Sequence, residues 1–237
     1  LRHRPGRVRA VLVDPDAPER EAAELAAAAA RAGVRLAVDR ERVRRRRRHA
    51  AAWVVTELSV EDDRLEPALD HLVLVRPAQA GNVGAALRAA LGFGVRDVAV
   101  LGGRVDPWAP HVLRASQGAR FALRVRSWAA WADYRGDHPD HAVLALVPPT
   151  TRTPVPATPL PDLAPPARAA WVVGPEAGGL PDEVLAIATP VTIPQDPELE
   201  SHNLAVAVGV ALFARAAARG RAATTSSARP TSQGGRP

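Results

Sequence analysis

Residues able to do chemistry gather in three short segments. The first is Gly81-Asn82-Val83-Gly84-Ala85-Ala86-Leu87-Arg88, and the second is Gly174-Pro175-Glu176-Ala177-Gly178-Gly179-Leu180-Pro181. The third is Glu200-Ser201-His202-Asn203-Leu204, which follows Ile193-Pro194. Each lies after a predicted strand, where α/β sheets place their ligands. Glycines after a strand mark either a phosphate cradle or a plain turn, and the chain has no G-x-G-x-x-G or Walker pattern. Taken singly, no segment identifies a reaction.

The elements that must position these segments alternate along the chain. In the first part, Val8–Val13, Val34–Val38 and Trp53–Leu58 are predicted strands. Between them lie a predicted helix, Glu19–Ala32, and a short basic helix or loop, Arg40–Arg48. This pattern predicts a small α/β unit, closed by an acidic connector over residues 59–70.

The alternation then restarts over a longer stretch. The predicted strands are Leu72–Val75, Asp97–Leu101, Ala122–Val125, Ala142–Val147, Ala170–Val173 and Val191–Ile193. The predicted helices are Gly84–Leu91, Pro110–Gln117, Trp128–Tyr134, Pro181–Ile187 and Asn203–Arg219. Such alternation predicts an α/β fold with a mostly parallel sheet covered on both faces. The proline-rich stretch Pro148–Pro166 is predicted to be a surface loop, because one pattern of strands continues on either side of it.

Two domains and a C-terminal tail are expected from this organisation. Residues 1–66 form the small α/β domain, and residues 67–221 form the larger one. Residues 222–237 are rich in Thr, Ser, Gly, Pro and Arg, a composition that predicts a disordered tail.

Together and in this order, the three segments resemble the motifs of the SpoU/TrmH branch of the SPOUT methyltransferases. The features are an Asn and an Arg six residues apart, a G-x-E-x-x-G-L block and a terminal S-x-N-hydrophobic block. The resemblance runs from about His71 to about Gly220 and includes Arg114-Ala115-Ser116-Gln117-Gly118-Ala119, which is similar to a further family segment.

This resemblance implies a SPOUT α/β-knot fold, in which the C-terminal segment of a parallel sheet is threaded into a deep trefoil knot. It also implies transfer of a methyl group from S-adenosyl-L-methionine to a ribose 2′-hydroxyl of rRNA or tRNA, by a homodimer with Arg88 near its interface. The first sixty residues look like the ribosomal-protein-like α/β domain that many members use to hold RNA. Its opening helix is missing and the chain begins at Leu1, so we expect an N-terminal truncation.

The resemblance assigns five catalytic positions: Asn82, Arg88, Glu176, Ser201 and Asn203. Arg88 matches the catalytic arginine of the family. An arginine with a pKa above about 12 is a poor base, so we expect it to clamp phosphate and stabilise the developing alkoxide. Taken alone, Arg88 reads as a surface arginine one turn into a helix.

The other catalytic positions also have plainer interpretations. Asn82 fits the N-cap of a helix beginning near Gly84, and Ser201 and Asn203 fit caps of the last helix. Asn82 is able to cap its helix and face the substrate at once. Taken alone, Glu176 reads as a solvated loop carboxylate, since Glu is rarely buried.

The matching cofactor-binding positions are Gly174, Glu176, Gly179, Ile193, His202 and Leu204. Apolar walls with backbone donors suit an adenine ring. Two residues depart from the family pattern. His202 stands where Leu is common, and Pro175 stands where many members have Asn or Ala. We expect both to be tolerated.

Arginines are the candidates for RNA contact. The chain carries a net charge of +6, and all 31 of its basic residues are arginine. Arginine suits phosphate and stacks on bases, although a GC-rich coding bias also enriches it. The predicted RNA-binding residues are Arg44, Arg45 and Arg46 within the run Arg44–Arg48, together with Arg88, Arg114 and Arg120. A charge run is also often a plain solvated face.

Composition excludes several classes of protein. There are no cysteines, hence neither disulfides nor thiolate metal sites. No membrane span or secretory signal is recognisable, so we expect a cytoplasmic protein. No metal-ligand cluster stands out, so we expect methyl transfer without metal or nicotinamide.

Two alternatives remain. One is a catalytically silent RNA-binding relative, and the presence of all five catalytic positions argues against it. The other is a nucleotide-binding dehydrogenase, which should show a glycine fingerprint after its first strand, where this chain has Asp14-Pro15-Asp16.

Overall fold

The computed structural model describes residues 4–46, 53–175 and 177–227. The chain divides into two compact units between Glu61 and Asp62. The sequence placed the division after residue 66. It falls earlier because Asp63 and Leu65 pack into the larger unit, where Asp63 accepts a hydrogen bond from the Val125 amide at 2.9 Å and Leu65 is buried.

The smaller unit contains the elements η1 (Pro5–Arg7), β1 (Val8–Val13), α1 (Glu19–Arg31), β2 (Leu36–Val38), α2 (Arg40–Arg46) and β3 (Val54–Leu58). Among its described residues, β1 is the central strand of three, parallel to β2 and antiparallel to β3. Its core is small and forms around Ala10, Leu12 and Val43.

The larger unit begins with β4 (His71–Val75), α3 (Ala80–Gly92), β5 (Asp97–Leu101), α4 (Pro110–Ala115), η2 (Ala119–Ala122), β6 (Arg124–Trp128) and α5 (Trp131–Asp137). It continues with β7 (Ala142–Leu146), β8 (Thr158–Pro159), η3 (Leu160–Asp162), β9 (Ala169–Val173), α6 (Asp182–Leu185), β10 (Thr189–Thr192) and α7 (Leu204–Ser227). Its described strands form one seven-stranded sheet in the order β6-β5-β4-β9-β7-β10-β8, with all neighbours parallel. The predicted α/β fold with a parallel sheet is therefore confirmed.

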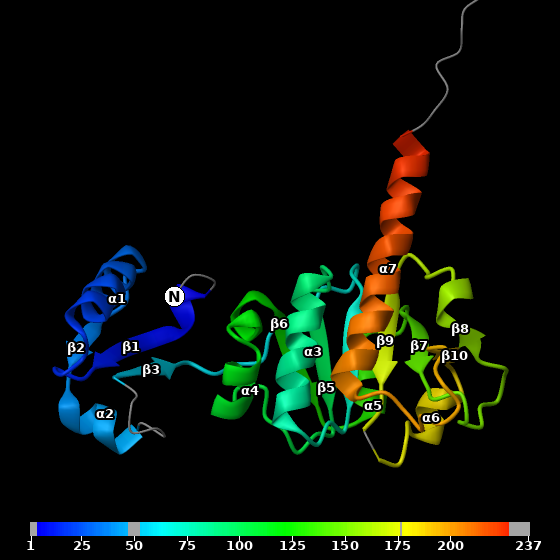
Figure 1. The fold of residues 1–237 in the computed structure, drawn as a ribbon, viewed down its shortest axis with the longest axis horizontal. Helices are drawn as coiled ribbons and strands as arrows, with labels where there is room; N and C mark the ends of the chain where they lie inside the picture. The colour runs from blue at the N-terminus through cyan, green and yellow to red at the C-terminus, as the bar shows by residue number, and fades with distance from the viewer. Residues whose placement is uncertain (1–3, 47–52, 176, 228–237) are drawn as a thin grey trace, which may run out of the picture. The chain divides into compact units, whose positions relative to one another are not determined.

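Helices cover both faces of this sheet (Figure 1). On one face, α3, α4 and α7 bury Val83, Leu87, Val112, Val208 and Leu212 against alternate strand residues. On the other face, α5 and α6 bury Trp131, Tyr134, Val184 and Leu185 against the remaining strand residues. The nearly continuous apolar strands reflect this two-sided burial. None of the described helices is long and apolar enough to cross a membrane.

Several elements differ from the predicted ones. Strand β6 is Arg124–Trp128 rather than Ala122–Val125, so Trp128 ends a strand and does not open the following helix, which is Trp131–Asp137. Helix α3 begins at Ala80, because Ala80 and Gly81 join its first turn and Gln79 takes the N-cap position. The segment 148–166 contains β8 and η3, and β8 adds a short edge strand beside β10. Helix α7 continues past Ala222 to Ser227. The remainder of the predicted tail, residues 228–237, lies outside the described residues.

A buried ion-pair group joins three elements at the amino edge of the sheet. Asp70, just before β4, pairs with Arg215 and with Arg219, the latter at 2.6 Å, and both arginines lie on α7. Its other carboxylate oxygen accepts a hydrogen bond from the Ala169 amide at 2.8 Å, at the start of β9. Arg215 also donates to the Phe93 carbonyl at 3.2 Å, just after α3. These contacts hold α7 against the sheet.

Three histidines, His71, His138 and His141, form a buried cluster at the same edge; we call it the histidine cluster. Burial is the largest cause of the lowered pKa of each imidazole, and it lowers the pKa of His71 to about 4. The imidazoles are therefore uncharged at neutral pH.

The contact between α3 and α4 is close enough to require a glycine. A Cβ at Gly84 would lie 2.4 Å from the Ala115 Cβ and 2.8 Å from the Ser116 amide nitrogen. Any larger residue at position 84 would push the two helices apart, so the glycine sets how closely α4 packs on α3.

We expect Gly84→Ala to lower the free energy of unfolding by about 1–3 kcal/mol, the usual cost of overpacking. Gly81→Ala in the same helix is the matched control, because a Cβ there would meet nothing within 4 Å. It should raise stability by roughly 0.5–1 kcal/mol, since alanine favours helix more than glycine does. Urea denaturation followed by circular dichroism measures both variants. Equal effects of the two substitutions would contradict the packing explanation.

Candidate functional site

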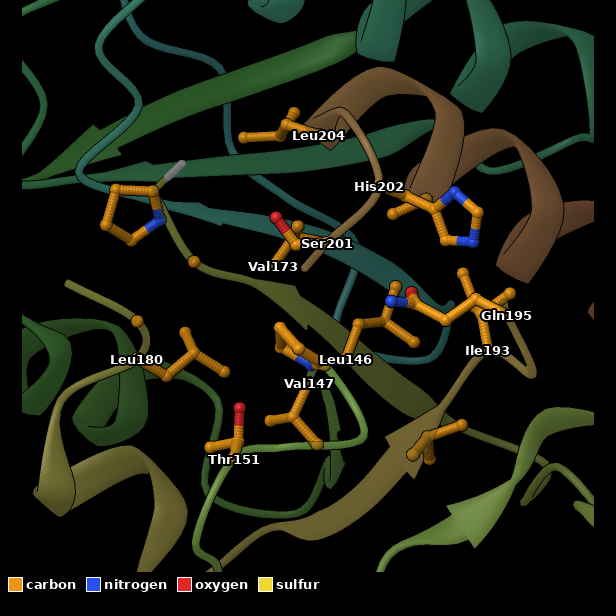
Figure 2. A pocket seen from close by; sticks show the side chains of 16 residues that line it. Leu146, Val147, Thr151, Val173, Leu180, Ile193, Gln195, Ser201, His202 and Leu204 are labelled. Atoms are coloured by element: carbon orange, nitrogen blue, oxygen red, sulfur yellow. The ribbon is translucent and has the colours of Figure 1, made fainter. Parts of the chain in front are cut away.

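A pocket of about 230 Å³ lies at the carboxyl ends of β7, β9 and β10 (Figure 2). Its apolar walls include Leu146, Val173, Leu180, Ile193 and Leu204, and its polar side chains include Thr151, Gln195, Ser201 and His202. The strands are parallel, so the loops that follow them meet at one edge. Segments far apart in the sequence are thereby brought into one site.

The predicted cofactor-binding positions that the structure describes all line this pocket: Gly174, Gly179, Ile193, His202 and Leu204. Ser201, a predicted catalytic residue, lines it as well. Glu176, which was predicted for both roles, lies outside the described residues. The second and third sequence segments thus form a single concave surface.

Glycines shape the loop after β9. Gly178 and Gly179 have φ angles of 87° and 67°, a left-handed conformation that glycine adopts without a steric penalty. A Cβ at Gly174 would come within 3.2 Å of the backbone of Gly179 and Leu180. The loop therefore folds back on itself, leaving backbone rather than side chain at that part of the pocket wall.

The first and third segments meet through two asparagines. Asn203 Nδ2 donates a hydrogen bond to Asn82 Oδ1 at 3.0 Å. Asn203 Oδ1 accepts from the Ala205 backbone amide at 2.9 Å, so Asn203 caps α7 as predicted. Asn82 does not cap α3, contrary to prediction, because α3 begins two residues earlier. Its side chain bonds instead to Asn203, just before α7, and to the Gln79 side chain at 3.4 Å.

Arg88 is not brought to the pocket of its own chain. It is exposed on α3 and does not line the pocket. Six residues along an α-helix turn the side chain by about 240° and move it about 9 Å, so Arg88 and Asn82 occupy different faces of α3. Within the described part of the chain, Arg88 has no hydrogen bond or ion pair.

Some of the predicted RNA-binding arginines are exposed, some lie outside the described residues, and Arg120 is buried. Arg44 and Arg45 are exposed on α2, where Arg45 pairs with Glu41, and Arg114 is exposed at the end of α4. Arg46 ends α2, and its side chain lies outside the described residues, as do Arg47 and Arg48.

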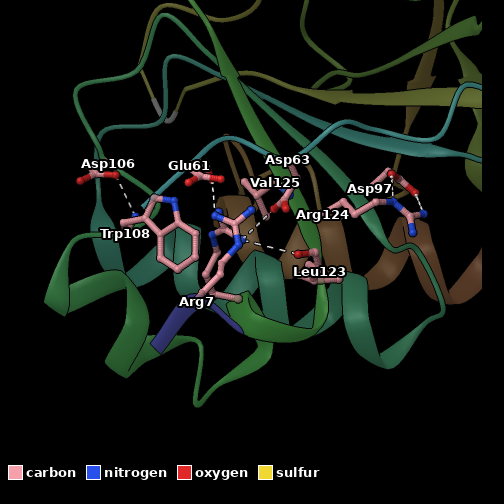
Figure 3. A network of polar contacts seen from close by, with 10 residues as sticks. Arg7, Glu61, Asp63, Asp97, Asp106, Trp108, Leu123, Arg124 and Val125 are labelled. Carbon is pink, nitrogen blue, oxygen red and sulfur yellow. Dashed lines mark hydrogen bonds and ion pairs between the residues drawn. The ribbon is translucent and has the colours of Figure 1, made fainter. Parts of the chain in front are cut away.

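Arg120 was wrongly predicted to contact phosphate. Its side chain is buried, pairs with Asp63 at 3.3 Å and stacks 3.7 Å from the centre of the Trp108 ring. Asp63 also anchors Val125, while Asp97 holds Arg124 at the start of β6 (Figure 3). Arg120 is therefore part of a buried structural network with Asp63 and Trp108.

Sequence reasoning missed part of the pocket. Leu146 ends β7 and Val147 directly follows it, and their position at the carboxyl end of a predicted strand was a usable signal. Thr151 lies in the segment that was interpreted only as a surface loop. Ala207 lies one turn into α7 and faces the pocket, a direction that no sequence pattern indicated.

Comparisons with known proteins agree with this geometry. Residues 70–213, more than half of the chain, match the model of the SpoU rRNA Methylase family. An uncharacterised tRNA/rRNA methyltransferase of Synechocystis is 34% identical over 145 residues, which cover 60% of this chain and 51% of that protein. The mitochondrial rRNA methyltransferase 3 of Xenopus tropicalis is 49% identical over 51 residues, which cover 22% of this chain and 12% of that protein. The chain thus matches about half of the first of these relatives and much less of the second.

Solved structures show the same fold. The SpoU methyltransferase AviRb of Streptomyces viridochromogenes, in complex with AdoMet, has a TM-score of 0.70 at 18% identity, covering 91% of this chain and 84% of that one. A structure described as an RNA 2′-O ribose methyltransferase has a TM-score of 0.67 at 26% identity, covering 91% and 83%. The chain belongs to the SpoU rRNA methylase family.

Asn203 is expected to stabilise α7 mainly through its cap. Asn203→Ala should lower the free energy of unfolding by about 1 kcal/mol. Asn203→Asp keeps an oxygen for the Ala205 amide and should stay within a few tenths of a kcal/mol of wild type. Urea denaturation of both variants measures the difference. Equal losses would show that the bond to Asn82, rather than the cap, carries the stability.

Proposed function

We propose that this protein transfers a methyl group from S-adenosyl-L-methionine to a ribose 2′-hydroxyl of RNA. The observation that carries the proposal is that the second and third motifs line one pocket, and that Asn203, next to the lining residues His202 and Leu204, bonds to Asn82 of the first motif. Family membership and the AdoMet complex of AviRb support the choice of methyl donor. Both rRNA and tRNA remain candidate substrates.

Each part of the site has a role in this reaction. The apolar walls and the backbone at Gly174 and Gly179 hold the donor, which supplies the electrophilic methyl group. Ser201 and Asn203 orient the ribose at the pocket mouth, and Asn82 fixes the Asn203 amide. Methyl transfer requires the reacting atoms to be aligned at about 3–3.5 Å. Asn82 at the start of α3 and Asn203 just before α7 are held by rigid helices, which helps to maintain that alignment.

The test uses purified protein, labelled S-adenosylmethionine, and ribosomal and transfer RNA from cells that lack this gene. Label should enter one RNA class and appear as a 2′-O-methylnucleoside after digestion. Replacing the target nucleotide with its 2′-deoxy analogue should abolish transfer. Label on a base would overturn the ribose assignment. Donor binding in calorimetry without transfer to either RNA would favour the silent RNA-binding relative.

Arg88 is proposed to clamp a phosphate and stabilise the developing alkoxide. Because it lies away from its own pocket, we propose that it acts on RNA at the site of a second protomer. The resemblance to the family implies a homodimer with Arg88 near the interface. An exposed apolar stripe on α7 supports the dimer: Val206, Val210 and Phe213 are 50%, 38% and 60% exposed and share one helix face. Helices α3 and α7 pack side by side, so Arg88 belongs to the same layer.

The smaller unit is proposed to hold the RNA. Residues 1–61 carry 14 arginines against nine acidic residues, whereas the rest of the chain carries 17 against 16. Most of the net positive charge therefore resides in the smaller unit. Arg44 and Arg45 on α2 are its proposed phosphate contacts, with Arg114 on the larger unit.

The larger unit is also proposed to have the trefoil knot of its family. What supports this is the strand order, since β9 inserts between β4 and β7, both of which precede it in the chain. The loop after β9 and the loop after β10 both line the pocket, which is the arrangement that a knot produces when the chain is threaded through a loop.

Arg88→Ala should reduce turnover on the order of 10²-fold or more, the usual cost of losing one preorganised donor. Affinity for S-adenosylmethionine should barely change, because Arg88 does not line the pocket. Arg88→Lys should restore little, since a point charge does not reproduce the guanidinium fork. Arg96→Ala, an exposed arginine just after α3, is the matched control. Wild-type turnover by Arg88→Ala would refute the catalytic assignment.

Sedimentation at micromolar concentration should show twice the chain mass of 25.0 kDa. Val210→Glu with Phe213→Glu places two charges on the apolar stripe and should give monomers. Ile187→Glu, at a similarly exposed apolar residue outside α7, should leave the dimer intact. An active wild-type monomer would refute the dimer, and dissociation by the Ile187 variant would place the interface elsewhere.

A further inference from the structure

The histidine cluster lies at the opposite edge of the sheet from the pocket. His71 is the first residue of β4, and His141 directly precedes β7. The pocket lies at the carboxyl ends of these parallel strands, a strand length away or about 16 Å. The cluster therefore takes no part in the proposed methyl transfer and needs an explanation of its own.

The three imidazoles are packed closely enough to share a ligand. One ring nitrogen from each lies within 4.8 Å of one from each of the others. The ring centroids are 4.6 Å apart for His71 and His138, 4.1 Å for His71 and His141, and 5.6 Å for His138 and His141. All three residues are less than a tenth exposed.

Hydrogen bonds to backbone carbonyls determine the tautomers of two rings. His71 Nε2 lies 3.0 Å from the Glu66 carbonyl oxygen, and His141 Nε2 lies 2.8 Å from that of Leu69. A carbonyl oxygen only accepts, so each Nε2 carries the proton and each Nδ1 carries a lone pair. Histidines that bind metals typically use one nitrogen as ligand while the other donates to such a carbonyl.

The third ring has a nitrogen that the described residues leave unsatisfied. His138 Nδ1 is buried and has no hydrogen-bond partner among them. Burying a polar nitrogen without a hydrogen-bond partner is unfavourable. A ligand at the centre of the cluster would remove that cost.

The turn that carries two of the histidines is held rigidly. The Arg135 guanidinium donates to the carbonyl oxygens of His138 at 3.1 Å, His141 at 3.0 Å and Pro139 at 2.8 Å. The turn thus keeps both imidazoles facing His71 without any ligand, so little ordering is left for a ligand to impose.

We propose that His71, His138 and His141 bind a divalent transition metal ion, with Zn²⁺ as the best match. Three neutral imidazoles suit Zn²⁺, whose bonds to nitrogen are about 2.0–2.1 Å long. That geometry needs nitrogens roughly 3.4 Å apart, so binding draws the rings together. The Tyr134 hydroxyl now lies 3.0 Å from His71 Nδ1, and the metal replaces that hydrogen bond. The bound ion joins β4 to the turn before β7 and stabilises the sheet at its amino edge.

The experiment uses untagged full-length protein, stripped with a chelator and then titrated with Co²⁺ or Zn²⁺ alone, without methyl donor or RNA. We expect one ion per chain, a visible absorption band of Co²⁺ bound by nitrogen, and a higher thermal midpoint with Zn²⁺. Because it measures no methyl transfer, its result is independent of the proposed reaction.

Two substitutions locate the ion. His138→Phe keeps an aromatic ring and His141→Gln keeps a polar side chain, and each should weaken metal binding at least about 100-fold, since each removes one of three ligands. His111→Gln, at an exposed histidine on α4, is the matched control and should bind as wild type does. A cooperative unfolding transition of either cluster variant shows that it is folded. Absence of stoichiometric binding by wild type, or full retention in the folded cluster variants, would overturn the site.

Discussion

The ion pairs of the buried Asp70 carboxylate with α7 are the interaction on which the arrangement of the larger unit depends. It binds two arginines of α7 and the first amide of β9, and so joins the last helix to the centre of the sheet. Asp70 is 3% exposed and Arg215 is 7% exposed. Removing Asp70 would leave Arg215 as a buried charge without its carboxylate, a loss that costs about 3–5 kcal/mol in such pairs. The pair therefore specifies where α7 lies.

The position of α7 in turn determines the pocket. Helix α7 starts at the carboxyl edge of the sheet and reaches Asp70 at the amino edge. Because the helix is rigid, the ion pairs with Asp70 also determine where its first residues lie. Its first residues supply Leu204 and Ala207 to the pocket wall, and Asn203 just before it bonds to Asn82. The close contact at Gly84 sets α4 against α3 on the same face. The site is thus held by helices packed on a rigid sheet, which suits the alignment that the proposed methyl transfer requires.

Burial, rather than residue type, separates the roles of the charged and titratable side chains. Arg88 and Arg114 are exposed and are proposed to contact RNA, whereas Arg120 is buried against Trp108 and Asp63. His202 lines the proposed cofactor pocket, whereas His71, His138 and His141 are gathered at the far edge. The two edges of one parallel sheet thereby carry two different proposed chemistries, methyl transfer at one and metal binding at the other.

The sequence by itself determined the alternation of strands and helices, the parallel sheet and the residues of the three motifs, because apolar periodicity and glycine spacing are local properties. It misplaced the start of α3, since the N-cap preference of Asn82 was outweighed by a helix that begins at Ala80. It also missed the burial of Arg120 and the meeting of His71 with His138 and His141. Only the tertiary structure decided these, because each depends on contacts between residues many positions apart, which no local pattern encodes.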